Sequence, residues 1–208
     1  YHDDNAPGDL LTRGQAASRF LPLAGGTLTG GLTAPSYAYS VAQERTVSLP
    51  GPAFIPADPS DNDVDALRRS HNRLYFATNV ALPLGASRSM DLDAALQVPQ
   101  GAQLKSLICY GRRTVANATV TIAASLNRAP NASNDLPVPL ASLSINPSGS
   151  SLGVVPGTGA VSDTEFVDLN ANFYTVRVTF TARTPNNGDL PNQSFDGCRV
   201  TYTVTSPN

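Results

Sequence analysis

The sequence has no tryptophan, one methionine, two cysteines and two histidines in 208 residues. Because sugar-binding surfaces favour large aromatic rings with a polar handle, the absence of tryptophan argues against a carbohydrate-binding module. Four tyrosines can substitute for it: Tyr75, Tyr110, Tyr174 and Tyr202. Cys109 and Cys198 lie far apart in the sequence, and their spacing matches no zinc motif. We interpret them as buried free thiols, with a single bridge between two strands as the alternative.

Charge is also scarce. Charged residues make up 14% of the chain, the net charge is −2, and like charges form no run, which argues against a nucleic-acid or membrane-surface partner. No apolar stretch approaches the roughly 20 residues of a membrane span, and the chain does not begin with a basic-then-apolar leader. We therefore expect no membrane insertion. The first residue, Tyr1, is typical of a fragment or a processed product.

Residues suited to catalysis are few. The sequence has no nucleophile elbow, phosphate-binding loop, dinucleotide fingerprint or His/Glu metal pattern. Two carboxylate pairs remain, Asp91 with Asp93 and Asp163 with Glu165, and a pair of carboxylates can hydrolyse a glycosidic bond. Each pair is spaced two residues apart in an expected strand, so both side chains share one face, which we expect to be solvent rather than a cleft. The prediction is a protein that is not an enzyme and that has no cofactor and no metal.

Four aspartates within residues 58–65 suggest a calcium loop, because its oxygen ligands alternate along the chain. However, Ala66 stands where such a loop needs glycine, and Asn72 stands where it needs glutamate. Residues 64–70 are instead predicted to form a short helix capped by aspartate.

After residue 73 the apolar residues recur with a period of two, and the segments end at Pro, Gly, Asn and Ser turns. The expected strands are 73–79, 89–98, 102–110, 117–127, 139–145, 165–169, 173–183 and 198–205. Many short strands without a long helix indicate an antiparallel β-sandwich that resembles a jelly roll. In 173–183 the packed face is predicted to hold Val176, Val178 and Phe180, and in 198–205 it is predicted to hold Val200, Tyr202 and Val204. These two strands are expected to pair with each other.

Upstream, Thr12 and Gln15 form a capping box, which predicts a helix of about two turns that ends before Pro22. Residues 36–60 contain four of the prolines and are predicted to form a connector with short strands. The predicted organisation is thus a mainly β chain with an N-terminal segment at 1–35, a connector at 36–60 and a sandwich at 61–208.

The segment DLLTRGQAASRFLPLAGGTLTGGLTAP, residues 9–35, resembles a repeat of bacteriophage tail fibres and of neck or collar fibres. In that family a short helix of the type LTKAQADARY is followed by LPLSGGTLTGPLT. The departure is Gly31, where the family often has proline or asparagine. A glycine-rich linker is the alternative interpretation, but linkers seldom carry leucine in register.

The resemblance implies an intertwined homotrimer in which glycine pairs let the backbones approach and leucines are buried between chains. The residues expected to trimerise are Leu21, Leu23, Gly25, Gly26, Leu28, Gly30, Gly31 and Leu32. The implied protein is a structural component of the virion, assembled in the bacterial cytoplasm among other virion proteins.

For such a fibre or spike we expect attachment to a host-surface glycan or protein. Exposed loops on a rigid sandwich are where recognition usually occurs, and the candidate loops are 128–137, 146–160 and 184–197. A head or neck decoration protein and a secreted carbohydrate-binding module are the alternative functions.

Overall fold

The structure is a computed structural model of the 208-residue chain. It describes residues 41–58, 67–71, 73–76, 87–113, 119–132, 136–146, 153–161, 165–183 and 194–205. The chain divides into two compact units, Tyr1–Tyr37 and Ala38–Asn208, and every described residue belongs to the second. The predicted helix after Thr12 and the trimerisation segment from Leu21 to Leu32 lie outside the described residues.

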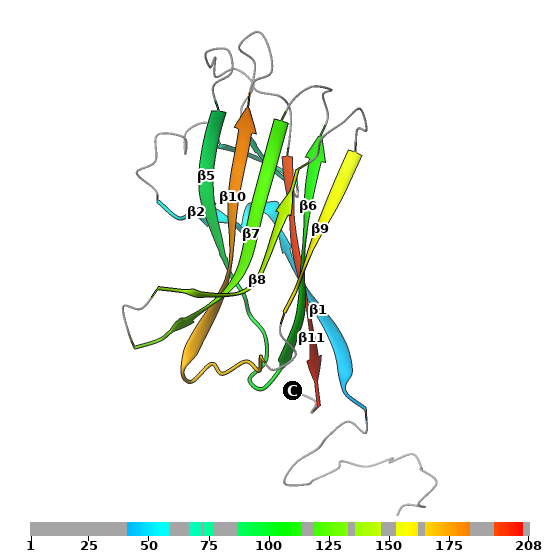
Figure 1. Cartoon of the computed structure of the whole chain (residues 1–208), viewed down its shortest axis with the longest axis vertical. Coiled ribbons are helices and arrows are strands. Elements are labelled where there is room, and N and C mark those ends of the chain that lie inside the picture. Colours follow the sequence, from blue (N-terminus) through cyan, green and yellow to red (C-terminus); the bar gives the residue numbers. More distant parts are fainter. Residues whose placement is uncertain are drawn as a thin grey trace, which may run out of the picture. The chain divides into compact units, whose positions relative to one another are not determined.

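The described residues form two antiparallel sheets that face each other (Figure 1). The first sheet has the order β3-β4-β11-β6-β9, and β1 also pairs with β11. The second has the order β2-β5-β10-β7-β8. The strands are β1 (Gln43–Pro50), β2 (Ile55–Pro56), β3 (Leu67–Ser70), β4 (Arg73–Phe76), β5 (Ser87–Ala95), β6 (Gln103–Arg113), β7 (Thr119–Pro130), β8 (Val138–Ile145), β9 (Gly153–Ala160), β10 (Asn172–Arg183) and β11 (Ser194–Val204).

The eight longer strands follow the connectivity of a jelly roll. Numbered 1 to 8 along the chain, they are β1, β5, β6, β7, β8, β9, β10 and β11. In this numbering the first sheet has the order 1-8-3-6 (β1-β11-β6-β9), and the second has the order 2-7-4-5 (β5-β10-β7-β8). In this arrangement consecutive strands mostly cross from one sheet to the other, and two Greek keys result. The prediction of a mainly β, antiparallel sandwich is confirmed for the described residues.

The core lies between the sheets and follows the period-two pattern. Val176, Val178 and Phe180 are buried, and Arg177 between them faces outward, as the sequence predicts. At one edge a 3₁₀ turn, η1 (Gly51–Ala53), carries the chain from the first sheet to the second. Phe54 follows this turn and is fully buried, with its ring edge-on to that of Phe195 at a centroid distance of 4.9 Å. Such aromatic pairs add about 0.5–1.5 kcal/mol to the stabilisation from burial.

The segment at 36–60, predicted as a connector, contributes to the sandwich itself. Its residues Gln43–Pro50 form β1, which pairs with β11 along its whole length, and Ile55–Pro56 form β2 at the edge of the second sheet. The prolines therefore do not keep this segment outside the fold. Of the described ones, Pro50 lies at a strand end, Pro52 in the 3₁₀ turn and Pro56 in an edge strand, where a missing N–H is tolerated.

The prediction of a short helix at 64–70 is wrong for residues 67–70, which the structure describes. Leu67–Ser70 is strand β3, and it forms a hairpin with β4 in which Ser70 pairs with Arg73. His71 in the turn has a φ of 52°, the left-handed conformation that tight hairpin turns require. Pairing with β4, which is itself anchored on β11, overrides the local helix signal. The aspartates at 61–65 lie outside the described residues.

The predicted pairing of the two best-defined strands is also wrong. β10 lies in the second sheet between β5 and β7, whereas β11 lies in the first sheet between β1 and β6. Alternation identifies the buried face of a strand but not its neighbour, so two strands with the same pattern can belong to opposite sheets. The expected strand at 165–169 makes only an isolated bridge, between Gln103 and Phe166.

The predicted recognition loops overlap with strands. β7 extends to Pro130, β9 occupies Gly153–Ala160, and β11 begins at Ser194. The strand β9 was missed because its sequence, GVVPGTGA, contains three glycines and a proline. It lies at the edge of its sheet, where proline costs no ladder hydrogen bond. At Gly159 a Cβ would lie 2.8 Å from the Ser142 carbonyl oxygen, so β9 needs a small residue beside β8.

Cys109 and Cys198 form a disulfide, so the interpretation as free thiols is wrong and the alternative holds. They stand directly opposite each other on β6 and β11, with 4.0 Å between their Cα atoms. Both are buried on the core side of the first sheet. The bridge could not be assigned from the sequence, because β11 was expected beside a different strand.

Candidate functional site

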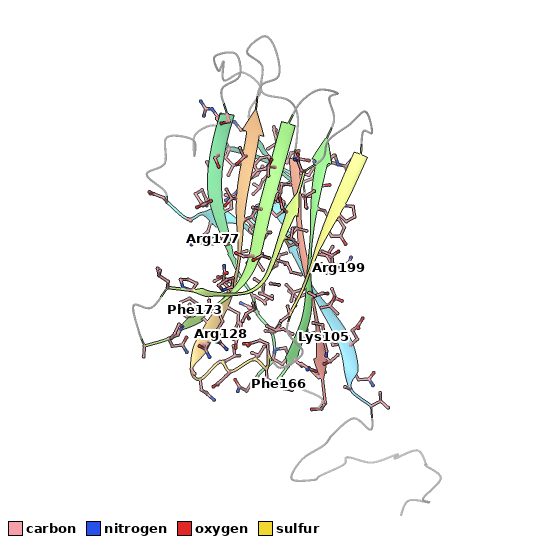
Figure 2. The ribbon with its side chains drawn as sticks, viewed as in Figure 1. Lys105, Arg128, Phe166, Phe173, Arg177 and Arg199 are labelled. Atoms are coloured by element: carbon pink, nitrogen blue, oxygen red, sulfur yellow. A yellow bond between two sulfur atoms is a disulfide. The ribbon has the colours of Figure 1, made fainter. Side chains whose placement is uncertain are left out.

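The outward face of the second sheet carries an ordered set of polar side chains. Asp93 on β5 stands opposite Arg177 on β10, and their hydrogen bonds are bidentate: Arg177 donates from Nε to Oδ1 and from Nη2 to Oδ2, each over 2.8 Å. Figure 2 shows Arg177 beside β10, on the side away from the other sheet. The planar guanidinium fork fits a carboxylate in this way and fixes the orientation of both groups.

Two further cross-strand pairs extend this contact along β5 and β10. Thr179 donates a hydrogen bond to Asp91 Oδ1 over 2.6 Å, and the hydroxyls of Ser89 and Thr181 are 2.9 Å apart. Each pair is directly opposed in the strand register, so the six side chains form two parallel rows. We call them the polar ladder: Ser89, Asp91, Asp93, Arg177, Thr179 and Thr181.

The polar ladder remains in contact with water. The side chains of Arg177 and Asp93 are 45% and 27% exposed, so their ion pair contributes at most about 1 kcal/mol to stability. The hydrogen bonds to Asp93 raise the pKa of the Arg177 guanidinium, which stays charged at any physiological pH. A carboxylate has about four acceptor sites. The ladder thus has acceptors and hydroxyls left for a polyhydroxylated ligand.

A pocket of about 290 Å³ adjoins the ladder at the side of β2. Ala57, Asp58, Ser89 and Asp91 line it. The backbone N–H of Ala57 donates to the carbonyl of Asp91 over 2.8 Å, which fixes the chain after β2 against β5. The pocket and the ladder share Ser89 and Asp91, and together they form one continuous polar surface.

An aromatic ring lies on the same outward face. Phe173 begins the outward row of β10, and its side chain is 51% exposed. Figure 2 shows it below Arg177, nearer the end of the sandwich. An exposed ring beside hydrogen-bonding groups is the combination that binds sugars, because a ring packs against C–H groups and the polar groups contact hydroxyls.

Two further exposed apolar side chains precede β10 in the sequence. Phe166, which bridges to Gln103, is 58% exposed, and Leu169 in the turn before β10 is 43% exposed. The Asn131 side chain, just after β7, donates to the Leu169 carbonyl over 3.1 Å, so this turn is held against the second sheet. We call Phe166, Leu169 and Phe173 the apolar end. Contiguous exposed apolar surface is typical of a protein-protein contact, so these three side chains are candidates for one.

The structure places the sequence-predicted residues as follows. Asp91 and Asp93 share the outward face, as predicted. Glu165 binds Arg128 through an ion pair of 3.2 Å, and its expected partner Asp163 lies outside the described residues. The four tyrosines do not share one exposed surface, because Tyr174 is in the core. Tyr75, Tyr110 and Tyr202 are half-buried.

Sequence reasoning missed the cross-strand partners of the two aspartates. The alternation of apolar and polar residues placed Arg177 and Thr179 on a solvent-exposed face. No local sequence pattern, however, indicated that β5 pairs with β10. Within the described part of the chain, no group of three His, Cys, Asp or Glu side chains is placed to hold a metal ion. No helix among the described residues is long and apolar enough to cross a bilayer.

Tyr174 anchors the turn that presents the apolar end. Its buried hydroxyl accepts the backbone N–H of Asp168 over 3.0 Å. Burial raises the pKa of Tyr174 above its usual value, the hydrogen bond from Asp168 opposes that rise, and the charge of Glu165 adds to it. The folded protein therefore holds this proton more tightly than the unfolded chain does.

This pKa shift predicts an alkaline loss of stability. The contribution of Tyr174 is complete below pH 10, about the pKa of tyrosine in the unfolded chain, and is lost as the pH rises through the higher folded pKa. At pH 8, Tyr174→Phe is expected to lower the free energy of unfolding by about 1 kcal/mol through the lost hydrogen bond. Urea unfolding of both proteins at pH 8, 10 and 11 should show this difference shrinking. If the difference in unfolding free energy between the two proteins stays constant with pH, the raised pKa of Tyr174 is contradicted.

No protein-family model matches the chain, and no curated protein sequence matches it. Among solved structures, the chain is similar to TmCBM61, whose structure was determined in complex with beta-1,4-galactotriose. The similarity covers 78% of this chain and 88% of that chain at 16% sequence identity, with a TM-score of 0.33. A likeness this weak says nothing about what the present chain binds.

Proposed function

We infer that this chain is a structural virion protein of a bacteriophage, a homotrimeric fibre or spike whose sandwich attaches to a glycan on the host surface. The observation that carries this proposal is the repeat at residues 21–33, LPLAGGTLTGGLT, which precedes a jelly-roll sandwich. The repeat has almost no core of its own, so its leucines need other chains to be buried. Assembly would take place in the bacterial cytoplasm with the other virion proteins.

The apolar end supports self-association. β1 begins where β11 ends, since Gln43 pairs with Val204, and Val41 just before β1 is 69% exposed. Figure 1 shows the start of β1 and the end of β11 toward the lower end of the view, the half in which Figure 2 shows Phe166 and Phe173. The start of β1 thus lies in the same half of the sandwich as Phe166 and Phe173. A second copy of the chain is the occupant that fits this arrangement.

The polar ladder supports the glycan part of the proposal. Its hydroxyl, carboxylate and guanidinium groups can exchange hydrogen bonds with sugar hydroxyls. A single such face binds weakly. Three copies on one fibre raise the effective concentration, and the resulting avidity can exceed the single-site affinity by about 10²–10⁴-fold.

Sedimentation tests the trimer. The full chain is expected to sediment at three times its mass of 21.7 kDa. The double variant Leu23→Asp/Leu28→Asp should be monomeric, because buried charge opposes chain association. The matched variant Thr27→Asp/Thr29→Asp adds the same charge outside the expected leucine contacts and should remain trimeric. A full chain that stays monomeric at high concentration would refute the fibre proposal.

Cell binding tests the attachment. The labelled full chain is expected to bind some strains in a panel of bacteria and to release no reducing sugar from them. On a strain that binds, Arg177→Gln should weaken binding by roughly tenfold, equivalent to about 1.4 kcal/mol. The exposed Arg68 on β3 provides a control, and Arg68→Gln should leave binding unchanged. A trimer that binds no strain would favour a decoration protein, and sugar release would favour an enzyme.

A further inference from the structure

A second pocket lies on the other sheet, away from the polar ladder. It has a volume of about 210 Å³ and is formed where the end of β1 meets β6 and β11. Its polar lining comes from Ser48, Tyr110, Asp196 and Arg199. Pockets for drug-sized ligands measure about 300–1,000 Å³, so this one suits a group the size of a single sugar ring.

An irregularity in β11 creates the pocket. The register with β6 shifts between Phe195 and Gly197, which leaves Asp196 as an extra residue that bulges from the ladder. Gly197 then adopts a φ of 125°, and its backbone lies against β1 so closely that a Cβ would collide with the Leu49 carbonyl oxygen. The bulge therefore opens a hollow beside Tyr110 that a regular strand would fill.

The charge around the pocket is positive. Asp196 is its acidic residue, and this carboxylate is already neutralised: Arg112 donates from Nε and Nη2 to Oδ2 over 3.2 Å, and Arg73 lies 3.6 Å from Oδ1. Ser194 donates to the same Oδ1 over 2.9 Å. A carboxylate held by two guanidinium groups leaves one positive charge in excess at that point.

Arg199 adds a second cation. It is exposed on the outward face of β11, opposite Ser48 on β1 and Ile108 on β6. Within the described residues, no carboxylate forms an ion pair with it. An unpaired guanidinium at the rim of a pocket can bind a carboxylate or a phosphate in bidentate fashion.

The remaining lining fits a sugar ring. Tyr110 is half-buried and lines the pocket, and its side chain combines an aromatic ring with a hydroxyl. Ser48 contributes a hydroxyl from β1. We propose that this pocket binds one anionic sugar residue, whose carboxylate or phosphate contacts Arg199 and whose ring packs on Tyr110. This site is separate from the polar ladder on the second sheet, and it does not depend on trimer formation.

Titration of the full chain with single sugars tests the proposal. D-glucuronic acid and glucose 6-phosphate, followed by ligand-observed NMR, provide the carboxylate and phosphate arms, and D-glucose is the neutral control. At least one anionic sugar is expected to bind ten or more times as tightly as glucose. Inorganic phosphate alone should bind more weakly than the sugar phosphate, because it cannot contact Tyr110.

Variants then locate the binding. Arg199→Gln should weaken binding of the anionic sugar by tenfold or more, Arg199→Lys should restore part of it, and Tyr110→Phe should retain most of it. Arg68→Gln is the matched control and should bind as the unaltered chain does. The proposal is overturned if glucose binds as well as the anionic sugars, if neither anionic sugar binds, if inorganic phosphate binds as tightly as glucose 6-phosphate, or if Arg199→Gln and Arg68→Gln behave alike. Because single sugars are used, failure of cell attachment would leave this result unaffected.

Discussion

Replacing both Cys109 and Cys198 with alanine is expected to lower the free energy of unfolding by about 4 kcal/mol. The disulfide joins residues 89 positions apart. A covalent link across so long a loop removes much of the conformational freedom of the unfolded chain, and the entropy model gives a value near the upper end of the usual range. For a domain of this size, such a loss corresponds to a melting temperature lower by roughly 10 °C. Calorimetry of the two proteins measures this shift.

Reduction of the unaltered protein is the matched control. It should lower the melting temperature nearly as much as the double substitution, because both remove the same link between β6 and β11. If the oxidised and reduced proteins unfold within about 1 kcal/mol of each other, the bridge does not constrain the unfolded chain as proposed. Cytosolic thiols are kept reduced, so a chain assembled in the bacterial cytoplasm would gain this stabilisation only after release.

Gly197→Ala is expected to destabilise the sandwich by about 3 kcal/mol or more. Two costs add at this position. The φ of 125° is one that side chains rarely adopt, and the new Cβ would collide with the Leu49 carbonyl oxygen and lie 2.9 Å from Pro50 Cα. Backbone atoms cannot turn aside as a flexible side chain can, so β1 has to move away from β11. Urea unfolding should show a lower midpoint for this variant.

Gly101→Ala separates the two costs. Gly101 also has a positive φ, 75°, but no atom lies within 4 Å of the position that a Cβ would take. It occupies a turn closed by the Ala102 N–H and the Pro99 carbonyl over 3.2 Å. Only the conformational cost applies there, about 1–2 kcal/mol. Equal losses at Gly101 and Gly197 would mean that the contact with β1 is not as tight as the structure indicates.

Much of the fold could be predicted from local pattern. The alternation in residues 173–183 identified the buried face of β10, with Val178 and Phe180 inward and Arg177 outward. This works because a strand that packs on one side must place every second side chain in the core. The same rule put Asp91 and Asp93 together on the outward face, where the polar ladder lies.

Other parts could not be predicted, because they depend on contacts between distant residues. The strand β9 carries glycine and proline, and only its pairing with β6 makes it a strand. Leu67–Ser70 has a local helix signal, yet it pairs with β4 as a hairpin. The pocket around Arg199 requires a bulge whose position is set by the register of β11 against two neighbours.

The sequence by itself determined that the chain from about residue 73 onward is a β-sandwich with few groups suited to catalysis, and that residues 9–35 resemble a phage fibre repeat. Period and composition are local properties, so the residues alone carry them. The tertiary structure decided which strands are neighbours. That choice brought Cys109 to Cys198, Asp93 to Arg177, and β1 to the bulge of β11. Strand pairing is a property of the whole chain, since it depends on the total burial that one topology achieves over another.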